Sequence, residues 1–390
     1  MKQQLTFTPA DDGLWEQYDQ LAARAYGHPI ADIARLREHA DLQIALRGGR
    51  VVAGGLGLLV DQFFGGAPVL SACLGDGCVA PEERGDHLAT DMATERLRPL
   101  IERGAVISTI VTSSTGYARR LGWEAPVDVL AWTVATDDLK RSFTGENFEV
   151  EHGLTDEAAT LQHQLARQWN GPVHRPAWWT LWKQDKNNLT AYRFARPGLP
   201  TAGLLTLSTK RHERHGMSMI VHDFWAATQP AAAAMLAFLG RHNTRARTIT
   251  FRRGALPPYP TLLHNLRHHR TTAESWHPWM LRILDAPEAI RLRGWPADLT
   301  TTIQVEIENS TSDGWDRWLL HIKNGSAELT PTSVPGQVTL SRRQLAVWYA
   351  GGYRTATSAR MAGVQAVAEQ SLASLIRSTT DREPWLPDHF

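Results

Sequence analysis

The spacing of apolar residues predicts alternating helices and strands over the first 135 residues of the chain. Trp15, Tyr18, Leu21 and Ala22 fall on one face of a helix, so residues 15–26 are predicted to be helical. This alternation is typical of a mixed α/β domain. The other helices are predicted at 32–40, 87–103 and 116–121, and the strands at 43–46, 51–60, 68–79, 106–111 and 127–134.

A polar segment at 137–146 is predicted to be a linker. After it, the order of helices and strands in the first segment is partly repeated between residues 148 and 287. The repeated elements include an alanine-rich helix at 229–240 and a strand at 248–251. A repeated order of elements indicates an internal structural repeat, so we expect a second domain related to the first.

A third pattern begins near Pro287. Apolar and polar residues alternate over 303–307 and again over 318–322, and Asn324-Gly325 then turns the chain into another alternating run. This pattern predicts a half-buried antiparallel hairpin. Helices are predicted at 341–350 and 358–376, and Trp385, Leu386 and Phe390 near the chain end are expected to be buried.

The length and composition of the chain are consistent with a globular protein of several domains. A chain of 390 residues is too long for one ordinary core, and 43% hydrophobic with 21% charged residues suits a globular protein. The net charge of +1 gives no global attraction to nucleic acid. With no apolar run near the roughly 18 residues that span a bilayer and no signal pattern, we expect a cytoplasmic protein without a membrane partner.

The stretch from Cys78 to Ala89 carries the clearest chemistry, because a strand there delivers the chain onto the N-terminus of a helix. Exposed amides at such a terminus bind pyrophosphate. The stretch resembles the coenzyme A loop of the GCN5-related N-acetyltransferases (GNAT), Arg/Gln-x-x-Gly-x-Gly/Ala, with Arg84 and Ala89 at its first and last positions. His87 stands where glycine is expected, and Asp86 adds a negative charge. The predicted cofactor is acetyl-CoA or another acyl-CoA, bound by Cys78, Val79, Arg84, Gly85, Asp86, His87, Leu88 and Ala89.

Over nearly its whole length the chain resembles the Eis (enhanced intracellular survival) family. The coenzyme A loop, the segment 279–287, the alternating strand 318–322 and the final Phe390 all have counterparts there. The resemblance implies an α/β (α+β) fold of three domains, and a homo-oligomer, which in the family is a hexamer. The implied domains are residues 1–136, GNAT-like; 147–287, a degenerate GNAT-like domain; and 288–390, sterol-carrier-protein-like.

The resemblance also implies catalytic residues. The family's general base is the C-terminal carboxylate, here that of Phe390. Its general acid is a tyrosine four residues before a glycine, here Gly122, which places Ala118 at that position and Tyr117 next to it. Either Tyr117 is presented instead, or the acid is missing. His87 is a third catalytic candidate.

The predicted substrate-binding residues are His28, His389 and Trp123. His28 and His389 stand where the family has carboxylates that bind polycationic amines, so an aminoglycoside-type substrate is not expected. His28, His87 and His389 could meet in one cleft as acid–base groups, an anion site or a metal site. The spacing of these histidines does not indicate metal, and two cysteines, Cys73 and Cys78, do not make a zinc site.

The predicted function is acyl transfer from acyl-CoA to a small-molecule amine. One alternative is a repurposed enzyme of natural-product biosynthesis that acts without acetyl-CoA. Another is a non-catalytic protein that holds an aromatic or apolar ligand between its tryptophans. Trp169, Trp178, Trp179 and Trp182 lie close in sequence and could form either a packed core or an aromatic wall for such a ligand.

Overall fold

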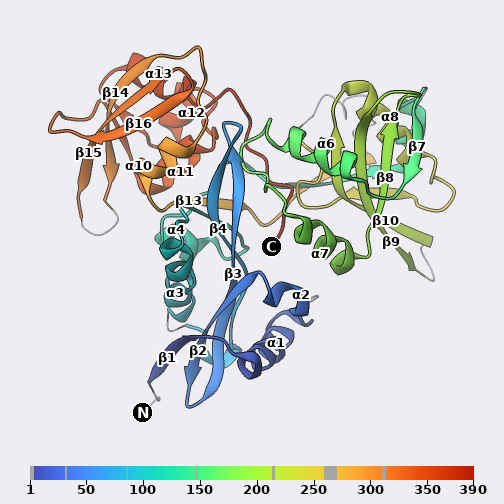
Figure 1. The fold of residues 1–390 in the computed structure, drawn as a ribbon, viewed down its shortest axis with the longest axis horizontal. Coiled ribbons are helices and arrows are strands. Elements are labelled where there is room, and N and C mark those ends of the chain that lie inside the picture. The colour runs from blue at the N-terminus through green and yellow to red at the C-terminus, as the bar shows by residue number, and fades with distance from the viewer. Residues whose placement is uncertain are drawn as a thin grey trace. The chain divides into compact units, whose positions relative to one another are not determined.

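The structure is a computed structural model of the chain, and it describes residues 4–30, 33–85, 87–145, 147–212, 216–258, 270–309 and 313–390 (Figure 1). The chain forms two compact units. The first contains residues 1–127, 278–384 and 388–390, and the second contains residues 128–277 and 385–387.

A six-stranded sheet in the order β1-β2-β3-β4-β5-β13 lies in the first unit. All neighbours are antiparallel except β4 and β5, which are parallel and joined by the crossover helix α3. The strands are β1 (Leu5–Pro9), β2 (Ala40–Arg47), β3 (Arg50–Phe64), β4 (Ala67–Val79), β5 (Ile107–Val111) and β13 (Trp279–Ile283), and the helices are α1 (Asp12–Tyr26), α2 (Ile33–Arg37), α3 (Leu88–Glu102) and α4 (Thr115–Arg120).

Helix α1 forms where the sequence supplies caps and an apolar face. Asp11 caps the N-terminus of α1 through the N–H of Leu14, and Gly27 ends the helix at φ 80°. The buried face of α1 is the predicted set of Trp15, Tyr18, Leu21 and Ala22. The predicted helix at 15–26 is therefore confirmed, with three more residues at its start.

Two features open the sheet at the end of β4. Only residues 71–74 of β4 pair with β5, so residues 75–79 have no partner on that side. The register of β3 against β4 also shifts between Gly54 and Leu56, and Asp76 opposite this bulge has φ 42°. The bulged, unpaired end of β4 leaves backbone groups facing the space between β4 and β5.

Two strands exchange between the sheets, contrary to the sequence prediction. Residues 127–134 were expected to end the first domain, but β6 (Leu130–Ala135) pairs with β11 (Thr248–Phe251) and β12 (Thr271–Ser275) in the second sheet. In return, β13 pairs with β5 in the first sheet. Apolar runs predict that a strand forms, but they carry no information about which distant strand pairs with it.

A seven-stranded sheet in the order β12-β6-β11-β10-β9-β8-β7 makes the second unit. The alanine-rich segment predicted at 229–240 is helix α8, capped by Thr228 and buried along most of its length. The remaining elements are β7 (Glu149–His152), β8 (Thr190–Ala195), β9 (Thr201–His212), β10 (Gly216–Ala226), α5 (Thr136–Ser142), α6 (Asp156–Ala166), α7 (Ala177–Asn187) and α8 (Gln229–Gly240).

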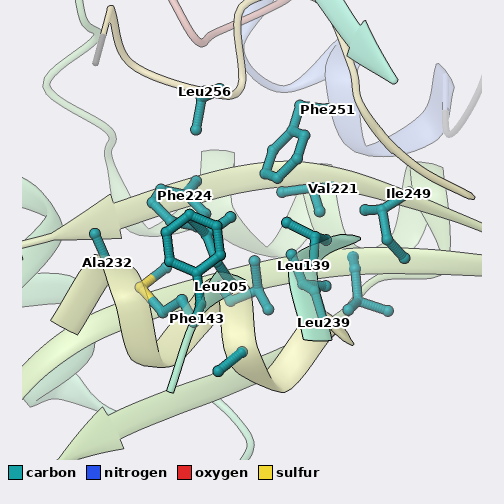
Figure 2. Close-up of a cluster of buried hydrophobic side chains, with 14 of the residues drawn as sticks. Leu139, Phe143, Leu205, Val221, Phe224, Ala232, Leu239, Ile249, Phe251 and Leu256 are labelled. Atoms are coloured by element: carbon teal, nitrogen blue, oxygen red, sulfur yellow. The ribbon is translucent and has the colours of Figure 1, made fainter. Parts of the chain in front are cut away.

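The predicted linker at 137–146 is wrong, because α5 occupies its first half. Leu139 is fully buried and packs into the apolar cluster around Leu205, Phe224 and Phe251 (Figure 2). The buried carboxylate of Asp138 pairs with Arg141 and Arg270. A polar composition concealed this helix, since its polar residues find partners inside the fold.

Trp179 and Trp182 of α7 are buried, and their ring centroids lie 5.4 Å apart. Of the two alternatives for the tryptophans, these two residues therefore form part of a packed core and not an aromatic wall for a ligand.

A five-stranded sheet in the order β16-β15-β14-β17-β18 forms the C-terminal part of the first unit. The predicted hairpin is confirmed, because β14 and β15 pair antiparallel and Asn324 and Gly325 turn with positive φ into β16. The elements are β14 (Thr301–Glu308), β15 (Trp315–Lys323), β16 (Ser326–Pro331), β17 (Val338–Leu340), β18 (Gln365–Ala366), α10 (Ala286–Leu292), α11 (Arg342–Tyr349), α12 (Ala356–Met361) and α13 (Glu369–Arg377).

The long helix predicted at 358–376 is two helices. Gly363, at φ 82°, follows the end of α12, and the chain then forms the short strand β18 before α13 begins. A glycine in the left-handed region just after the last helical turn is a common helix stop. No helix among the described residues is long and apolar enough to cross a membrane.

Candidate active site

A cavity of about 610 Å³ lies in the first unit at the unpaired end of β4, and we refer to it as the β4–α3 cleft. Its walls are the end of β4, the chain between β4 and α3, the first turns of α3, and α4 with the residues before it. Seven of the eight predicted cofactor-binding residues line it: Cys78, Val79, Arg84, Gly85, His87, Leu88 and Ala89. The eighth, Asp86, lies outside the described residues.

The N-terminus of α3 opens into this cleft. His87 is the N-cap residue at φ 59°, and its side chain accepts no hydrogen bond from the first turn. Gly85, at φ 103°, bends the chain before it. An N-terminus without a side-chain cap presents N–H groups and the positive end of the helix dipole, which suits a phosphate group.

Two exposed arginines flank the cleft. Arg84 precedes α3, Arg120 ends α4, and both line the cavity. Within the described part of the chain, neither forms an ion pair with a carboxylate. Guanidinium groups in this state are available to an anionic ligand.

Tyr117 lines the cleft and is half-buried, whereas Ala118 is buried in the core between α3 and α4. The local turn therefore presents Tyr117, not Ala118, to the cavity. This is the geometry that the first of the two sequence alternatives requires, although the role of Tyr117 stays a prediction.

Three groups with raised pKa values lie around Cys78. The hydroxyl of Tyr18 donates to the carbonyl of Asp76, that of Tyr26 donates to the carbonyl of Gly77, and the sulfur of Cys78 lies 3.5 Å from the Tyr18 hydroxyl. Burial raises the pKa of all three groups. The raised pKa of Cys78 disfavours its thiolate, which is the form that acts as a nucleophile or metal ligand.

Three stretches of the chain match known protein families. Residues 6–125 match an acetyltransferase (GNAT) domain, residues 171–283 match another acetyltransferase (GNAT) domain, and residues 286–387 match a sterol carrier protein domain. The chain is an Eis-like GNAT protein with a C-terminal sterol carrier domain. As a member of the N-acetyltransferase family, it is an enzyme.

One curated relative of this GNAT protein matches most of its length, and another matches about a quarter of it. An uncharacterized N-acetyltransferase of Streptomyces avermitilis is 25% identical over 353 residues, which are 84% of this chain and 82% of that protein. The N-acetyltransferase Eis of Mycobacterium tuberculosis is 34% identical over 105 residues, or 26% of this chain and 24% of Eis. A GCN5-related N-acetyltransferase of Anabaena variabilis has the same fold, with a TM-score of 0.86, 22% identity, and coverage of 99% of this chain and 100% of that one.

The C-terminus of this GNAT protein lies against β4. A side-chain carbon added to Gly75 would lie 2.5 Å from the terminal carboxyl carbon of Phe390, so only glycine fits there. Gly75 begins the unpaired stretch of β4 that forms one wall of the cleft. Neither Phe390 nor His389 is among the described residues that line the cavity itself.

The other two predicted substrate-binding residues lie apart from the cavity. His28 is exposed, and its ring stacks on Tyr26, a residue of the cleft wall, with ring centroids 6.2 Å apart. Trp123 is fully buried in the core, with the guanidinium of Arg282 at 5.0 Å from its ring centroid. No group of three residues able to hold a metal ion was found within the described ranges.

Sequence reasoning missed Arg96, which reaches the cleft from α3. Its side chain is 6% exposed and donates to the carbonyls of Leu56 and Gly75, each at 2.5 Å, beside the bulge. No ion pair joins it to a carboxylate of the described residues. The glycines at 54, 55, 57, 75 and 77 were the available signal, since side chains at 55 and 77 would collide with this guanidinium.

Proposed function

We propose that the chain transfers an acyl group from an acyl-CoA thioester to a small-molecule amine in the β4–α3 cleft. The observation that supports this most is the meeting of three features in one cavity. They are the unpaired end of β4, the open N-terminus of α3, and the half-buried phenol of Tyr117 on α4.

The residues present fit the donor. The first-turn amides of α3 suit its pyrophosphate, with Arg84 and Arg120 as nearby counter-charges. Residues 75–79 have no strand partner on the β5 side, so backbone groups there that are not already bonded to Arg96, Tyr18 or Tyr26 could bond the amide groups of the pantetheine arm. Backbone N–H groups near Cys78 and Val79 would polarise the thioester carbonyl.

In the proposed reaction the amine nitrogen attacks the thioester carbon, forming the C–N bond while the C–S bond breaks. The carboxylate of Phe390 takes the proton that the amine loses, and the phenol of Tyr117 gives a proton to the leaving thiolate. Tyr117 then regains a proton from solvent, and the carboxyl group of Phe390 releases the proton that it took. The position of the terminal carboxyl at Gly75 is compatible with the first of these roles.

His28 and His389 remain the proposed acceptor-side residues. Trp123 is fully buried in the core, so it could influence the acceptor only through packing. We propose a homo-oligomer on the resemblance alone. Because histidines replace carboxylates in this proposal, the acceptor is a monoamine or an aromatic amine instead of a polycation.

The test is calorimetric titration of the full chain with acetyl-CoA. Ala89→Glu puts a carboxylate into the exposed first turn of α3, in the cleft wall, and should weaken acetyl-CoA binding by at least about tenfold through charge repulsion. Thr94→Glu adds the same charge to an exposed position farther along α3 and serves as the matched control. Absence of binding by the unmodified chain, or equal binding by all three proteins, would refute the proposal.

A further inference from the structure

A second cavity, of about 530 Å³, lies between α4 and the C-terminal sheet, within the first unit. We call it the arginine hollow. Gly116, Arg119, Arg120 and Gly122 form its α4 side, and the residues of the C-terminal domain that line it are Glu308, Trp315, Ser341, Arg342 and Arg343. It is large enough for a ligand of nucleotide size.

Positive charge prevails in the hollow. Four guanidinium groups line it, against one carboxylate, that of Glu308. Glu308 already accepts a hydrogen bond from the backbone N–H of Arg342 at 2.9 Å, and its carboxylate is 4.0 Å from the guanidinium of Arg342. Glu124, outside the lining, is shared by Arg119 at 3.0 Å and Arg343 at 3.5 Å. Two carboxylates therefore lie against four guanidinium groups, so the hollow has an excess of positive charge. Arg120 has no carboxylate partner among the described residues.

A flat aromatic ring stands beside these charges. Trp315 is the first residue of β15, and 49% of its surface is exposed. No described aromatic or cationic group stacks on its ring. A large exposed indole next to guanidinium groups is a surface on which a nucleobase can stack while its phosphates pair with arginine.

The arginine hollow and the β4–α3 cleft share one lining residue, Arg120. Tyr117 faces the cleft, whereas Gly116 and Arg119 face the hollow, so the short helix α4 stands between the two cavities. The donor in the proposed function has its thioester at one end and a 3′-phosphorylated adenosine at the other, with a pyrophosphate between them. Such a ligand could place its thioester in the β4–α3 cleft and its adenosine in the arginine hollow, with Arg120 lining both cavities.

We propose that the arginine hollow binds the 3′-phosphorylated adenosine end of the acyl-CoA donor, with Trp315 against adenine and Arg119, Arg342 and Arg343 at the 3′-phosphate. This inference rests on the proposed function and extends it, because it makes the C-terminal domain part of the donor site. The 3′-phosphate then becomes a selection element: a donor without it loses its charge-assisted hydrogen bonds to the hollow.

The experiment compares three probes by calorimetry on the full chain: acetyl-CoA, 3′-dephospho-acetyl-CoA and adenosine 3′,5′-bisphosphate. We expect acetyl-CoA to bind at least about tenfold more tightly than its dephospho form, and the bisphosphate to bind alone and compete with acetyl-CoA. The double variant Arg342→Gln/Arg343→Gln should lose this discrimination. Arg317→Gln, which removes an exposed arginine of β15 outside the hollow, is the matched control.

Equal affinity for acetyl-CoA and its dephospho form would overturn the inference while leaving the proposed function intact. If acetyl-CoA itself does not bind, the proposed function fails and this inference with it. The comparison of the two donors needs no variant, so it decides the matter even if the double variant does not fold. Competition by inorganic phosphate alone, without a contribution from adenosine, would likewise reject the assignment.

Discussion

Arg96 places a positive charge beside the bulge of β4, where two backbone carbonyls accept its hydrogen bonds. A buried cation without a carboxylate partner is costly unless hydrogen bonds or a ligand compensate for the lost water. The surrounding glycines make room for it, since a side-chain carbon on Gly55 would lie 2.5 Å from the guanidinium carbon. The shape of the cleft wall therefore depends on Arg96 and on residues without side chains.

Gly55→Ala should destabilise the fold. The added methyl group meets three atoms of a guanidinium that is held at the bulge, so we expect a loss of about 1–3 kcal/mol in the free energy of unfolding. Denaturant unfolding measures this loss. Gly13→Ala, in the exposed first turn of α1 with its nearest described atom at 3.7 Å, is the control and should change stability by less than about 0.5 kcal/mol. A tolerated Gly55→Ala would show that Arg96 is not fixed there.

Tyr117→Phe tests the proposed acid. Removing the phenol should lower kcat about 100-fold while leaving the KM for acetyl-CoA almost unchanged, because the proton is needed only as the thiolate leaves. The measurement is thiol release from acetyl-CoA with a panel of monoamines. Tyr192→Phe, in the second unit, is the control. Unchanged kcat in Tyr117→Phe would exclude this residue as the acid.

Strand edges and helix ends place the groups of the cleft. The pairing of β4 with β5 over only residues 71–74 opens the sheet, and the left-handed N-cap at His87 opens α3. Most strands of the first sheet could be predicted from their apolar runs. The exchange of β6 and β13 could not, because pairing between strands far apart in sequence depends on register and tertiary packing. Helix α5 was missed because its polar residues, which suggested a linker, find ion-pair partners inside the fold. The break at Gly363 was missed because a single glycine ends a helix that the apolar pattern predicted to continue.

A bulge in the second sheet predicts a pH effect on stability. The register of β9 against β10 shifts at His222, whose ring nitrogen lies 2.8 Å from the hydroxyl of Ser208. Burial, with the nearby charge of Lys183, lowers the pKa of His222 to about 3, from an ordinary value near 6.5. Between these values the unfolded chain binds a proton that the folded chain does not, so stability falls as the pH falls from 6.5.

His222→Gln should reduce this dependence by the contribution of His222, at most about 1.4 kcal/mol per pH unit. A smaller slope should remain from His163, whose pKa is also lowered by burial. Urea unfolding at several pH values between 4.5 and 7.5 measures the slope. His152→Gln, at an exposed position of β7, should keep it. Parallel slopes for the unmodified chain and His222→Gln would contradict the assignment.

At the scale of the molecule, each unit anchors part of the C-terminal tail. Trp385 is buried in the second unit, where its indole N–H donates to the carbonyl of Gly254 at 2.5 Å. Asp388 is buried in the first unit. Burial of Cys73, together with the nearby charge of Asp388, raises the pKa of the Cys73 thiol to about 12. The burial expected for Trp385 and Leu386 is confirmed. Of the site, the loop residues could be predicted from a motif, whereas Arg96 and the arginine hollow come from elements distant in sequence, which no local pattern reveals.

The proposed function requires the acyl-CoA donor to bind in the β4–α3 cleft. Hydrogen–deuterium exchange of the full chain, with and without acetyl-CoA, tests it most directly, since a bound donor would use the amides of the cleft. We expect slower exchange in residues 75–79 at the end of β4 and in residues 87–91 at the start of α3, and unchanged exchange in β7 and β8 of the second unit. Saturating acetyl-CoA that leaves both segments unprotected, or that protects a different region, would contradict it.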